Sequence, residues 1–579
     1  KLAFVDIGKE GLDYLLLPDN IYKDYLQVLY NTGARVISNS WGAPGSSYTG
    51  FSSEFDRFVN DFPDTLILVA NGNSGTDGPS SVGNPAVAKN VVGMGASLNM
   101  FISPAGVALF GPSLETQGPV SGSLVKMEPF DGCSASSQPD LSGNIAVLQR
   151  GECAFTEKVK MAQLAGAKGV AIINTENAML NMQGEDDTVT IPSLLLPSSL
   201  GDELLVMMQQ ATADTRQVVA RLVPRALEVL NSKNTQSLES LAEFSSTGPT
   251  ADGRIKPDVV APGSYLLSAA SGHSCSITTK RGTSMATPLT AGSATLVRQY
   301  FMEGWYPRGQ KWSGLPILPS AALLKAVLIH SGQPMHGTRY NFATKGFTPM
   351  GPFPSMYQGF GLIDLSQTLV FRNPKRMLTE GSDHTLFVDQ NKGLYQSIRY
   401  RFRLQETGSV KITLVWIDPP GASISSGSIL VYRLLFSACV DNGPPVVGNH
   451  MLGATPTAPD NKNNVQIILF KEVNAQQEVE VVVDRGNAPE KFEKYALVVT
   501  GPEMELVSKR EEGLVSLLTD LKQAHFQQGS SYEISWTIAS PHADGVAVYL
   551  INPNCTCCGT ERLLFEAKSS SVTSFWWDI

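Results

Sequence analysis

Charged side chains are scarce in this sequence, and long apolar runs are absent. Charged residues make up 17% of its 579 residues, and the net charge is −9. No basic run is long enough to follow a phosphate backbone, so we expect no nucleic-acid partner. No apolar stretch approaches the roughly 18–20 residues that a helix needs to span a bilayer, and no leader with a charged and then an apolar region is visible. We therefore expect no membrane span.

Cysteine is also scarce. The seven cysteines are Cys133, Cys153, Cys275, Cys439, Cys555, Cys557 and Cys558. An odd number leaves at least one without a partner in the chain. Cys133 and Cys153 flank a predicted strand and are a plausible disulfide, whereas the run at 555–558 lacks a histidine or a second cysteine pair at zinc spacing. Together with one glycosylation sequon, Asn554-Cys-Thr, this favours the secretory pathway or the extracellular space.

The length and the hydrophobic patterns indicate several domains, because a single core stops growing at roughly 250 residues. Residues 1–97 and 227–372 alternate strand and helix patterns, which predicts an α/β unit with a parallel sheet covered by helices on both faces. Residues 98–226 indicate an inserted α+β unit. Residues 373–502 have the alternation of an antiparallel β-sandwich, and residues 503–579 indicate a further β-rich module.

The individual elements follow from the same patterns. In the α/β parts, helices are expected at 19–32, 53–62, 284–301 and 320–329, and strands at 1–6, 35–40 and 65–70. In and after the insert, strands are expected at 145–149, 169–174 and 191–196, and helices at 155–165, from 199, and over a polar stretch at 227–241. The clearest strands of the β regions are 397–402, 410–416, 478–483, 532–537 and 545–550.

Gly282-Thr-Ser-Met-Ala-Thr-Pro is the string that points most directly to chemistry. The glycine allows a tight turn before a helix, so Ser284 would lie at the helix N-terminus, where free N–H groups and the dipole favour an oxyanion. A serine hydroxyl becomes a nucleophile only with a base and a rigid backbone beside it. Taken alone, Thr283 or Ser284 would more often be a helix N-cap.

This string resembles the nucleophile signature of the subtilisin-like serine proteases, and further segments match that family in order. They are Ser38-Asn-Ser-Trp-Gly, Val69-Ala-Asn-Gly-Asn-Ser-Gly, Phe244-Ser-Ser-Thr-Gly-Pro-Thr, Ile255-Lys-Pro-Asp-Val-Val-Ala-Pro-Gly and Gly359-Phe-Gly-Leu-Ile-Asp. The matches cover about 1–97 and 240–370. The resemblance implies a subtilisin-like fold and a serine endopeptidase that cleaves a protein or peptide substrate through an acyl-enzyme on Ser284.

The resemblance also implies roles for residues around the nucleophile. It makes Asn73 a donor to the oxyanion alongside the Ser284 N–H, while a turn asparagine is the common alternative. The implied substrate-binding residues are Ser40, Trp41, Gly42 and Gly72. Extended substrate would pair with the strand edge there, and Trp41 would either wall a subsite or pack in the core.

Two positions of the chain need comment when it is compared with the family pattern. Asn71 stands where the family usually has alanine, which affects the turn and not the donor. Asn84-Pro85 matches a family position that is often cis, although trans is the base-rate expectation for any X-Pro bond.

The acid and the base that the family requires have no match in the chain. The family orders its triad as Asp, then His in a His-Gly-Thr setting, then Ser. None of the seven histidines is followed by Gly-Thr-His: His273, His330, His336, His384, His450, His525 and His542. His273 fits the base poorly, and His336-Gly-Thr comes after the nucleophile helix. Because 1–6 resembles the family strand that follows the base, we expect the Asp and His upstream of residue 1.

Two alternatives to an active protease remain open. The first is an inactive homologue that binds peptides or glycans. The second is a lipase- or esterase-type hydrolase, which would require a Gly-x-Ser-x-Gly motif around its nucleophile, and Ser284 is not in such a motif.

The remaining parts also resemble known domains. The strings at 143–159 and 165–170 resemble the protease-associated domain, in which Cys133 and Cys153 fit a family disulfide. Val415-Trp-Ile-Asp-Pro-Pro-Gly and Asn463-Asn-Val-Gln resemble a jelly-roll domain, and the last module resembles Ig-like adhesion modules in pattern only. No cofactor is needed for the chemistry, and no metal ligand set is assigned. A structural calcium is possible but unplaced. Residues 431–435 lack the carboxylates that relatives often carry at this place. Asp441 and Asp460 could be ligands elsewhere, but we interpret them as loop residues.

Overall fold

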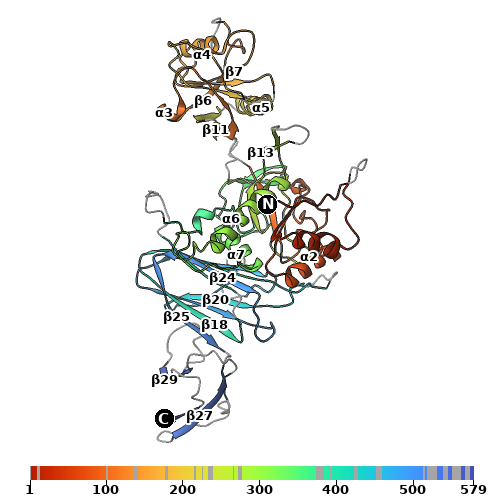
Figure 1. Ribbon diagram of the computed structural model, residues 1–579, viewed down its shortest axis with the longest axis vertical. Helices are drawn as coiled ribbons and strands as arrows, with labels where there is room; N and C mark the ends of the chain where they lie inside the picture. Colours follow the sequence, from red (N-terminus) through yellow and green to blue (C-terminus); the bar gives the residue numbers. More distant parts are fainter. Residues whose placement is uncertain are drawn as a thin grey trace.

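The computed structural model describes residues 2–8, 14–98, 102–134, 140–176, 180–213, 217–224, 226–231, 239–264, 266–270, 277–372, 384–390, 393–422, 428–441, 443–450, 459–512, 515–517, 531–538, 546–550, 562–567 and 574–578. The inserted unit lies at one end of the longest axis, the α/β part in the middle, the sandwich beyond it, and the C-terminal strands at the other end (Figure 1). Within the described ranges, no helix is both long enough and apolar enough to cross a membrane.

A parallel sheet is the centre of the α/β part. Its order is β1 (Val36–Asn39), β2 (Leu66–Ala70), β3 (Val92–Ser97) and β12 (Val259–Pro262). Every residue of β2 and β3 is buried, as expected for strands covered on both sides. This confirms the predicted α/β class.

The four helices predicted in the α/β part are confirmed to within a few residues. They are η1 (Tyr22–Leu26) with α1 (Gln27–Asn31), α2 (Gly50–Asp61), α6 (Thr283–Met302) and α7 (Ala321–Ser331). Two short helices, η2 (Gly75–Asp77) and η3 (Leu365–Gln367), were not predicted. Two hairpins accompany them, β13 (Leu266–Ala269) with β14 (Ile277–Lys280), and β15 (Thr338–Asn341) with β16 (Gly346–Pro349). Helix α6 contacts all four strands of the central sheet and also α7.

The strand expected at 1–6 is wrong for the residues described. Residues 2–8 form no strand, and Leu2 and Phe4 are almost fully exposed. The segment is held by a hydrogen bond from Leu16 N to Ile7 O of 2.9 Å. An apolar run becomes a strand only where a neighbouring strand pairs with it, and the described part of the chain brings none to this segment.

The insert is built on one mixed sheet. The order is β4 (Ile102–Pro104), β11 (Ala226–Asn231), β10 (Val219–Val223), β6 (Val120–Lys126), β7 (Ile145–Gln149), β8 (Gly169–Ile173), β9 (Ser193–Leu196) and β5 (Gly106–Val107). Its helices are α3 (Leu114–Gln117), α4 (Phe155–Leu164) and α5 (Ser198–Ala213). The predicted disulfide between Cys133 and Cys153 is confirmed, with a Cα–Cα distance of 5.7 Å.

The helical stretch predicted at 227–241 is wrong at its start, because β11 occupies 226–231. Leu227 and Val229 are buried alternately, the period of a strand, and β11 pairs with β10 and β4. The predicted division at 226 falls at the first residue of this strand; the predicted domain limits as a whole stay predictions.

The two ends of the insert lie side by side where they leave the α/β part. Ser97 and Leu241 form an isolated bridge, Leu98 N donates to Ser240 O over 2.9 Å, and Ala242 N donates to Ala96 O over 2.9 Å. The insert also has two apolar clusters of its own, one on each side of its sheet. We call these paired ends the neck of the insert.

The region after 383 is a two-sheet antiparallel sandwich, as predicted. One sheet has the order β17 (His384–Gln390), β24 (Tyr495–Pro502), β19 (Gly408–Trp416), β22 (Val465–Val473). The other has the order β21 (Val446–Val447), β20 (Leu435–Val440), β23 (Glu478–Asp484), β18 (Ser397–Leu404), β25 (Met504–Glu512). Strand β25 therefore extends this sheet past the predicted division at 502.

The C-terminal part contributes short strands, including the two predicted from sequence. They are β26 (Val515–Leu517), β27 (Ser531–Ile538), β28 (Val546–Leu550), β29 (Arg562–Ala567) and β30 (Ser574–Asp578). Strand β27 pairs with β26 and β30, and β28 pairs with β29.

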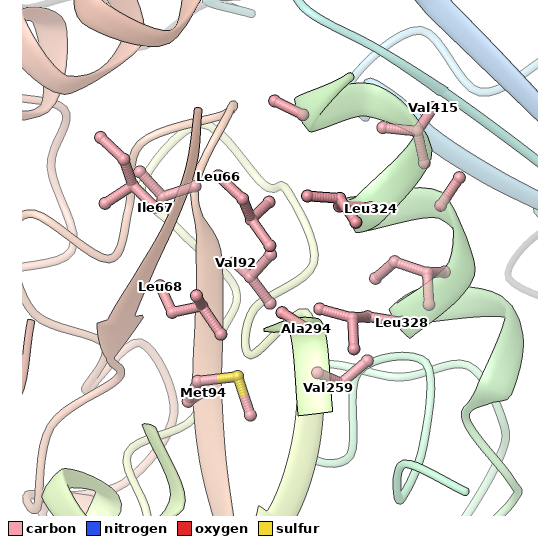
Figure 2. Packing of buried hydrophobic residues seen from close by; sticks show 14 of the residues in the cluster. Leu66, Ile67, Leu68, Val92, Met94, Val259, Ala294, Leu324, Leu328 and Val415 are labelled. Carbon is pink, nitrogen blue, oxygen red and sulfur yellow. The ribbon is translucent and has the colours of Figure 1, made fainter. Parts of the chain in front are cut away.

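The sandwich and the α/β part share one apolar core. Helix α7 packs against both β19 and β24. Figure 2 shows Leu324 and Leu328 of α7 turned toward Val92, Ala294 and Val259, and Val415 of β19 near the other end of the same helix. All eleven residues of α7 are buried. The helix is buried all round because one side faces the parallel sheet and the other faces the sandwich.

Polar side chains also cross this junction. The ring of His330 on α7 lies 2.9 Å from Thr413 Oγ1 and 2.7 Å from Thr500 Oγ1. Lys411 Nζ donates to Gly332 O over 2.6 Å. The fully buried Lys89 ammonium pairs with the fully buried Asp418 carboxylate of the sandwich.

Acid should weaken this junction through His330. Burial, helped by the positive charges of Lys411 and His384, holds the pKa of His330 well below its ordinary value. The unfolded chain takes up a proton near pH 6.5, so the free energy of unfolding should fall below that pH by up to about 1.4 kcal/mol per unit. Urea unfolding near pH 7.5 and near pH 5 measures this loss.

The variant His330→Gln isolates the histidine. Glutamine keeps a donor and an acceptor for the two threonines but binds no proton. Its loss of stability between the two pH values should be smaller than that of the wild type, and an equal loss would contradict the assignment.

Candidate active site

Helix α6 begins at the carboxyl end of the central sheet, and its first turn carries Ser284. Gly282, immediately before the helix, has φ +147°, a conformation that glycine adopts without strain. Ser284 N belongs to the first turn, whose N–H groups have no intrahelical acceptor. The small Ala286 and Ala294 are fully buried and let the helix approach the sheet. The local sequence thus places a serine at a helix end rich in free N–H groups.

Asn73 lies directly against this helix end. Its Oδ1 accepts from Thr283 N over 2.9 Å and from Thr283 Oγ1 over 3.0 Å. These two bonds fix the amide plane, and Asn73 Nδ2 has no hydrogen-bond partner among the described residues. Asn73 therefore caps α6 with its oxygen and keeps an N–H pair free beside Ser284.

Position 72 requires a glycine because the 244–250 segment lies very close to its backbone. Its φ is +108°, and a Cβ there would lie 2.8 Å from Ser246 Oγ. Ser246 Oγ accepts from Ser74 N over 2.9 Å, and Asn71 Nδ2 donates to Ser246 O over 2.7 Å. The asparagine at 71, a departure from the family pattern, thus ties the Asn73 loop to the 244–250 segment.

Ser40 and Ser284 are joined by two reciprocal hydrogen bonds. Ser40 Oγ donates to Ser284 O over 2.8 Å, and Ser284 Oγ donates to Ser40 O over 3.1 Å. Ser40 follows β1, the edge strand of the central sheet. The pair holds the end of β1 against the first turn of α6. This contact was not predicted, because nothing in either string indicates that side chains 244 residues apart would meet.

These residues surround one pocket of about 350 Å³, which we call the Ser284 pocket. Its lining consists of Leu15, Ser40, Trp41, Gly42, Ala43, Pro44, Ala70, Gly72, Asn73, Ser74, Ser81, Gly83, Asn84, Ser246, Thr283 and Ser284. The structure thus brings together all the site residues predicted from sequence apart from the disulfide, namely Ser40, Trp41, Gly42, Gly72, Asn73 and Ser284. Their roles in the reaction stay predictions. No histidine, aspartate or glutamate is part of this lining.

Trp41 does both things that the sequence left open. It lines the Ser284 pocket, and its ring packs edge-on against Tyr25 and Phe55, with ring centroids 5.9 Å and 6.1 Å away. The indole Nε1 donates to Tyr25 OH over 3.4 Å. These contacts hold the wall of the pocket rigid.

Asn84 is a pocket residue whose role the sequence did not reveal. Its Oδ1 accepts from Thr49 Oγ1 and Ser52 Oγ over 2.8 Å and 2.7 Å. Its Nδ2 donates to Gly45 O and Ser47 O over 2.7 Å and 3.1 Å. Asn84 therefore organises the loop after Trp41. The peptide bond to Pro85 is cis, so the base-rate expectation of a trans bond is wrong. The resemblance of Asn84-Pro85 to a family position that is often cis was the indication of a cis bond.

The 255–263 segment supports the site through a buried charge cluster. Asp258 pairs with Lys256 and Lys325 and accepts from Gly93 N over 2.6 Å. Burial raises the pKa of Asp258, but the two lysines outweigh it and the pKa is lowered overall. The ionised carboxylate thus joins β3, the start of β12 and α7 beneath the central sheet's apolar packing.

The other candidate residues lie away from the Ser284 pocket. His336 N donates to Glu239 Oε2 over 3.2 Å, and Cys439 is a buried thiol. Asp441 accepts hydrogen bonds from Gln477 and from Glu478 at the start of β23, and Asp460 accepts from Asn449 and Lys462. His273, Cys275, Asn554 and the cysteines at 555, 557 and 558 lie outside the described residues. Among the residues that are described, no group of three or more His, Cys, Asp or Glu side chains could hold a metal ion.

Comparison with known families agrees with this arrangement. The profile of the subtilase family (Peptidase S8) matches residues 1–351, which is more than half of the chain. The chain therefore belongs to the subtilase family of serine proteases.

Named relatives are distant. The serine protease/ABC transporter B family protein tagD of Dictyostelium discoideum is 25% identical over 83% of this chain and 26% of its own length. The minor extracellular protease Vpr of Bacillus subtilis (strain 168) is 29% identical over 40% of this chain and 29% of its own length. The chain thus spans less than a third of either relative. Among solved structures, an aminopeptidase from Aneurinibacillus sp. strain AM-1 matches 22% of this chain and 29% of its own chain, at 22% sequence identity. Its TM-score is 0.17, so we draw no conclusion from this likeness.

Proposed function

We propose that this chain is part of a serine endopeptidase that cleaves peptide bonds through an acyl-enzyme on Ser284. The observation that carries the proposal is that Ser284, at the first turn of α6, and Asn73, whose Oδ1 is bonded to Thr283 while its Nδ2 has no partner among the described residues, line the same pocket of about 350 Å³. Family membership supports it independently.

In this proposal the oxyanion is held by two donors. The Ser284 N–H is one of the free groups of the helix end, and Asn73 Nδ2 is the other. Both are set before substrate arrives, because Thr283 holds Asn73 Oδ1. Preset donors stabilise charge that develops in the transition state without reorganisation.

The proposal also requires a general base for Ser284 Oγ. In the structure this hydroxyl donates to the Ser40 carbonyl, which is not basic enough to accept the proton in the reaction. A histidine oriented by an aspartate, both N-terminal to Lys1, would accept it.

The other parts of the proposal follow from the relatives and the domain patterns. Vpr is named as an extracellular protease, and the Cys133–Cys153 disulfide suits an oxidising compartment, so we place this protein outside the cell or in the secretory pathway. The insert is proposed to act as a protease-associated domain and the sandwich as a jelly roll. The chemistry needs no cofactor, and a protein or peptide is the expected partner.

Labelling with a serine-directed fluorophosphonate tests this function. The full-length protein should form one adduct at Ser284, located by peptide mass spectrometry, because only an activated serine reacts quickly with this reagent. Ser284→Ala should abolish the adduct, whereas Ser293→Ala, on the same helix, should leave it unchanged. An adduct at another serine, or none in a protein that contains its upstream histidine and aspartate, would contradict the proposal. The last outcome would favour an inactive homologue that binds peptides or glycans.

A further inference from the structure

We propose that the Cys133–Cys153 disulfide of the insert is a modification site for low-molecular-weight thiols of the glutathione class. The thiol attacks Cys153, which then carries a mixed disulfide, and Cys133 leaves as a thiolate. The inference concerns the insert alone and is independent of the proposed function.

The disulfide lies at the start of α4. Cys153 stands just before Ala154, the N-cap of this helix, and Cys133 belongs to the loop that follows β6. Both cysteines are half-buried. Gly151, Glu152 and Ala154, which flank Cys153, are exposed. These exposed surroundings let a small thiol approach Cys153 from the solvent.

The two sulfurs of the disulfide differ in their contacts. Cys133 Sγ accepts from Lys158 Nζ over 3.2 Å and from Cys153 N over 3.3 Å, whereas no described residue donates to Cys153 Sγ. Donors and positive charge beside a sulfur stabilise its thiolate and lower the pKa of its thiol. A thiol of lower pKa leaves faster in disulfide exchange. Cys133 is therefore the better leaving group, and Cys153 is the sulfur that is attacked.

The ammonium of Lys158 is in place before any bond breaks. Lys158 is a fully buried residue of α4, and its Nζ also donates to Asp131 O. Burial lowers the pKa of Lys158, while the negative charges of Asp131 and Glu157 oppose that effect. A thiolate on Cys133 adds a negative charge in contact with Nζ, so the charged forms of the two groups stabilise each other as the disulfide opens.

The exchange balances at each step. The thiolate of the attacking thiol forms a bond to Cys153 Sγ, the bond between the two protein sulfurs breaks, and its electron pair leaves with Cys133 Sγ. A second thiolate can then attack the first thiol's sulfur in the mixed disulfide and release Cys153 as a thiolate. The two thiol molecules are thereby oxidised to their own disulfide, and the protein pair is reduced by two electrons.

Two lysines of α4 provide a variant and its matched control. Lys158→Met keeps an unbranched apolar stem in the buried position and removes the ammonium. Exchange should then slow by about 10-fold, because the thiol of Cys133 regains a higher pKa and leaves more slowly. Lys160 is partly exposed and pairs with Asp186 over 3.2 Å, so Lys160→Met should leave the rate unchanged.

Asp131 offers a change of the opposite sign. Its Oδ1 accepts from Cys133 N over 3.1 Å, which places a negative charge next to the cysteine that becomes a thiolate. Asp131→Asn keeps an acceptor for this N–H and removes the charge. Exchange should therefore become about 2- to 5-fold faster in this variant.

Mass spectrometry of the full-length protein identifies the attacked sulfur. The oxidised protein is mixed with reduced glutathione near pH 7.5, quenched with acid at successive times, alkylated with N-ethylmaleimide and digested. In the earliest samples glutathione should be found on Cys153 and N-ethylmaleimide on Cys133. The rise of this species with time gives the exchange rate of the wild type and of each variant.

Glutathione on Cys133 in the earliest samples, equal amounts on both cysteines, or an intact disulfide throughout would overturn the inference. A wild-type rate in Lys158→Met would do the same. If Lys158→Met does not fold, the position of the adduct in the wild type and the rate of Asp131→Asn decide the question, and a rate no faster than wild type contradicts the inference. None of these measurements involves Ser284, so failure of the proposed function is distinguished by the fluorophosphonate experiment alone.

Discussion

Replacing Lys89 by methionine should lower the free energy of unfolding by about 3–5 kcal/mol. Both side chains of the Lys89–Asp418 pair are completely buried, and Lys89 Nζ also donates to Ile429 O over 3.0 Å. Removing the ammonium leaves a carboxylate in the junction between the α/β part and the sandwich with no counter-charge. Denaturant unfolding followed by intrinsic fluorescence measures the loss.

The loss should depend on pH. Burial already raises the pKa of Asp418, and Lys89 opposes that effect. Without Lys89 the pKa rises further, so the carboxyl can take up a proton in mild acid and escape its charge. Lys89→Met should therefore be closer to the wild type at about pH 5 than at about pH 8.

Lys491→Met is the matched control. Lys491 and Glu493 form an exposed ion pair of 3.4 Å, with side chains 58% and 51% exposed. Such pairs contribute about 0–1 kcal/mol. If the two lysine variants lose the same stability, the buried pair does not hold the junction together. The double variant Lys89→Met with Asp418→Asn should recover part of the loss, because it leaves no unpaired charge.

Replacing Asn73 by alanine should reduce kcat of the full-length protease by about 10²- to 10³-fold. The change removes one of the two proposed oxyanion donors, which acts only once charge develops on the substrate carbonyl. KM should change little, because an interaction made in the transition state does not contribute to substrate binding. Steady-state hydrolysis of a fluorogenic peptide gives both constants.

Asn73→Asp separates the donor from the helix cap. Aspartate keeps an oxygen that accepts from Thr283 N and Thr283 Oγ1, but it loses the Nδ2 donor and brings a negative charge toward the oxyanion. Activity near the wild-type level in this variant would show that Asn73 serves only the turn and the cap. A loss at least as large as in Asn73→Ala, with an unchanged circular dichroism spectrum, supports the donor role.

The residues around Ser284 could be predicted because their information is local. Gly282 must adopt a positive φ, Ser284 must follow it at a helix start, and the buried β2 needs an uninterrupted apolar run. Each requirement is visible in a few adjacent residues, and the order of the motifs along the chain then brings the segments together in one fold.

Elements whose structure depends on distant partners were missed. Leu2 and Phe4 have a strand pattern but no strand to pair with in the described structure. Leu227 and Val229 alternate over too few residues to distinguish a strand from a helix, and the pairing of β11 with β10 decides the outcome. The same holds for ion pairs: Lys89 and Asp418 are 329 residues apart, and neither neighbourhood indicates the other.

The neck of the insert also indicates where the gene of such a protein can vary during evolution. Ser97 and Leu241 stand next to each other, and the adjoining Ala96 and Ala242 are hydrogen-bonded. A gene segment that encodes everything between them can be lost, exchanged or lengthened while β3 and β12 keep their pairing. The boundary before the sandwich gives no such freedom, because α7 would expose its apolar face. Recombination between relatives should therefore succeed at the neck and fail between α7 and β17.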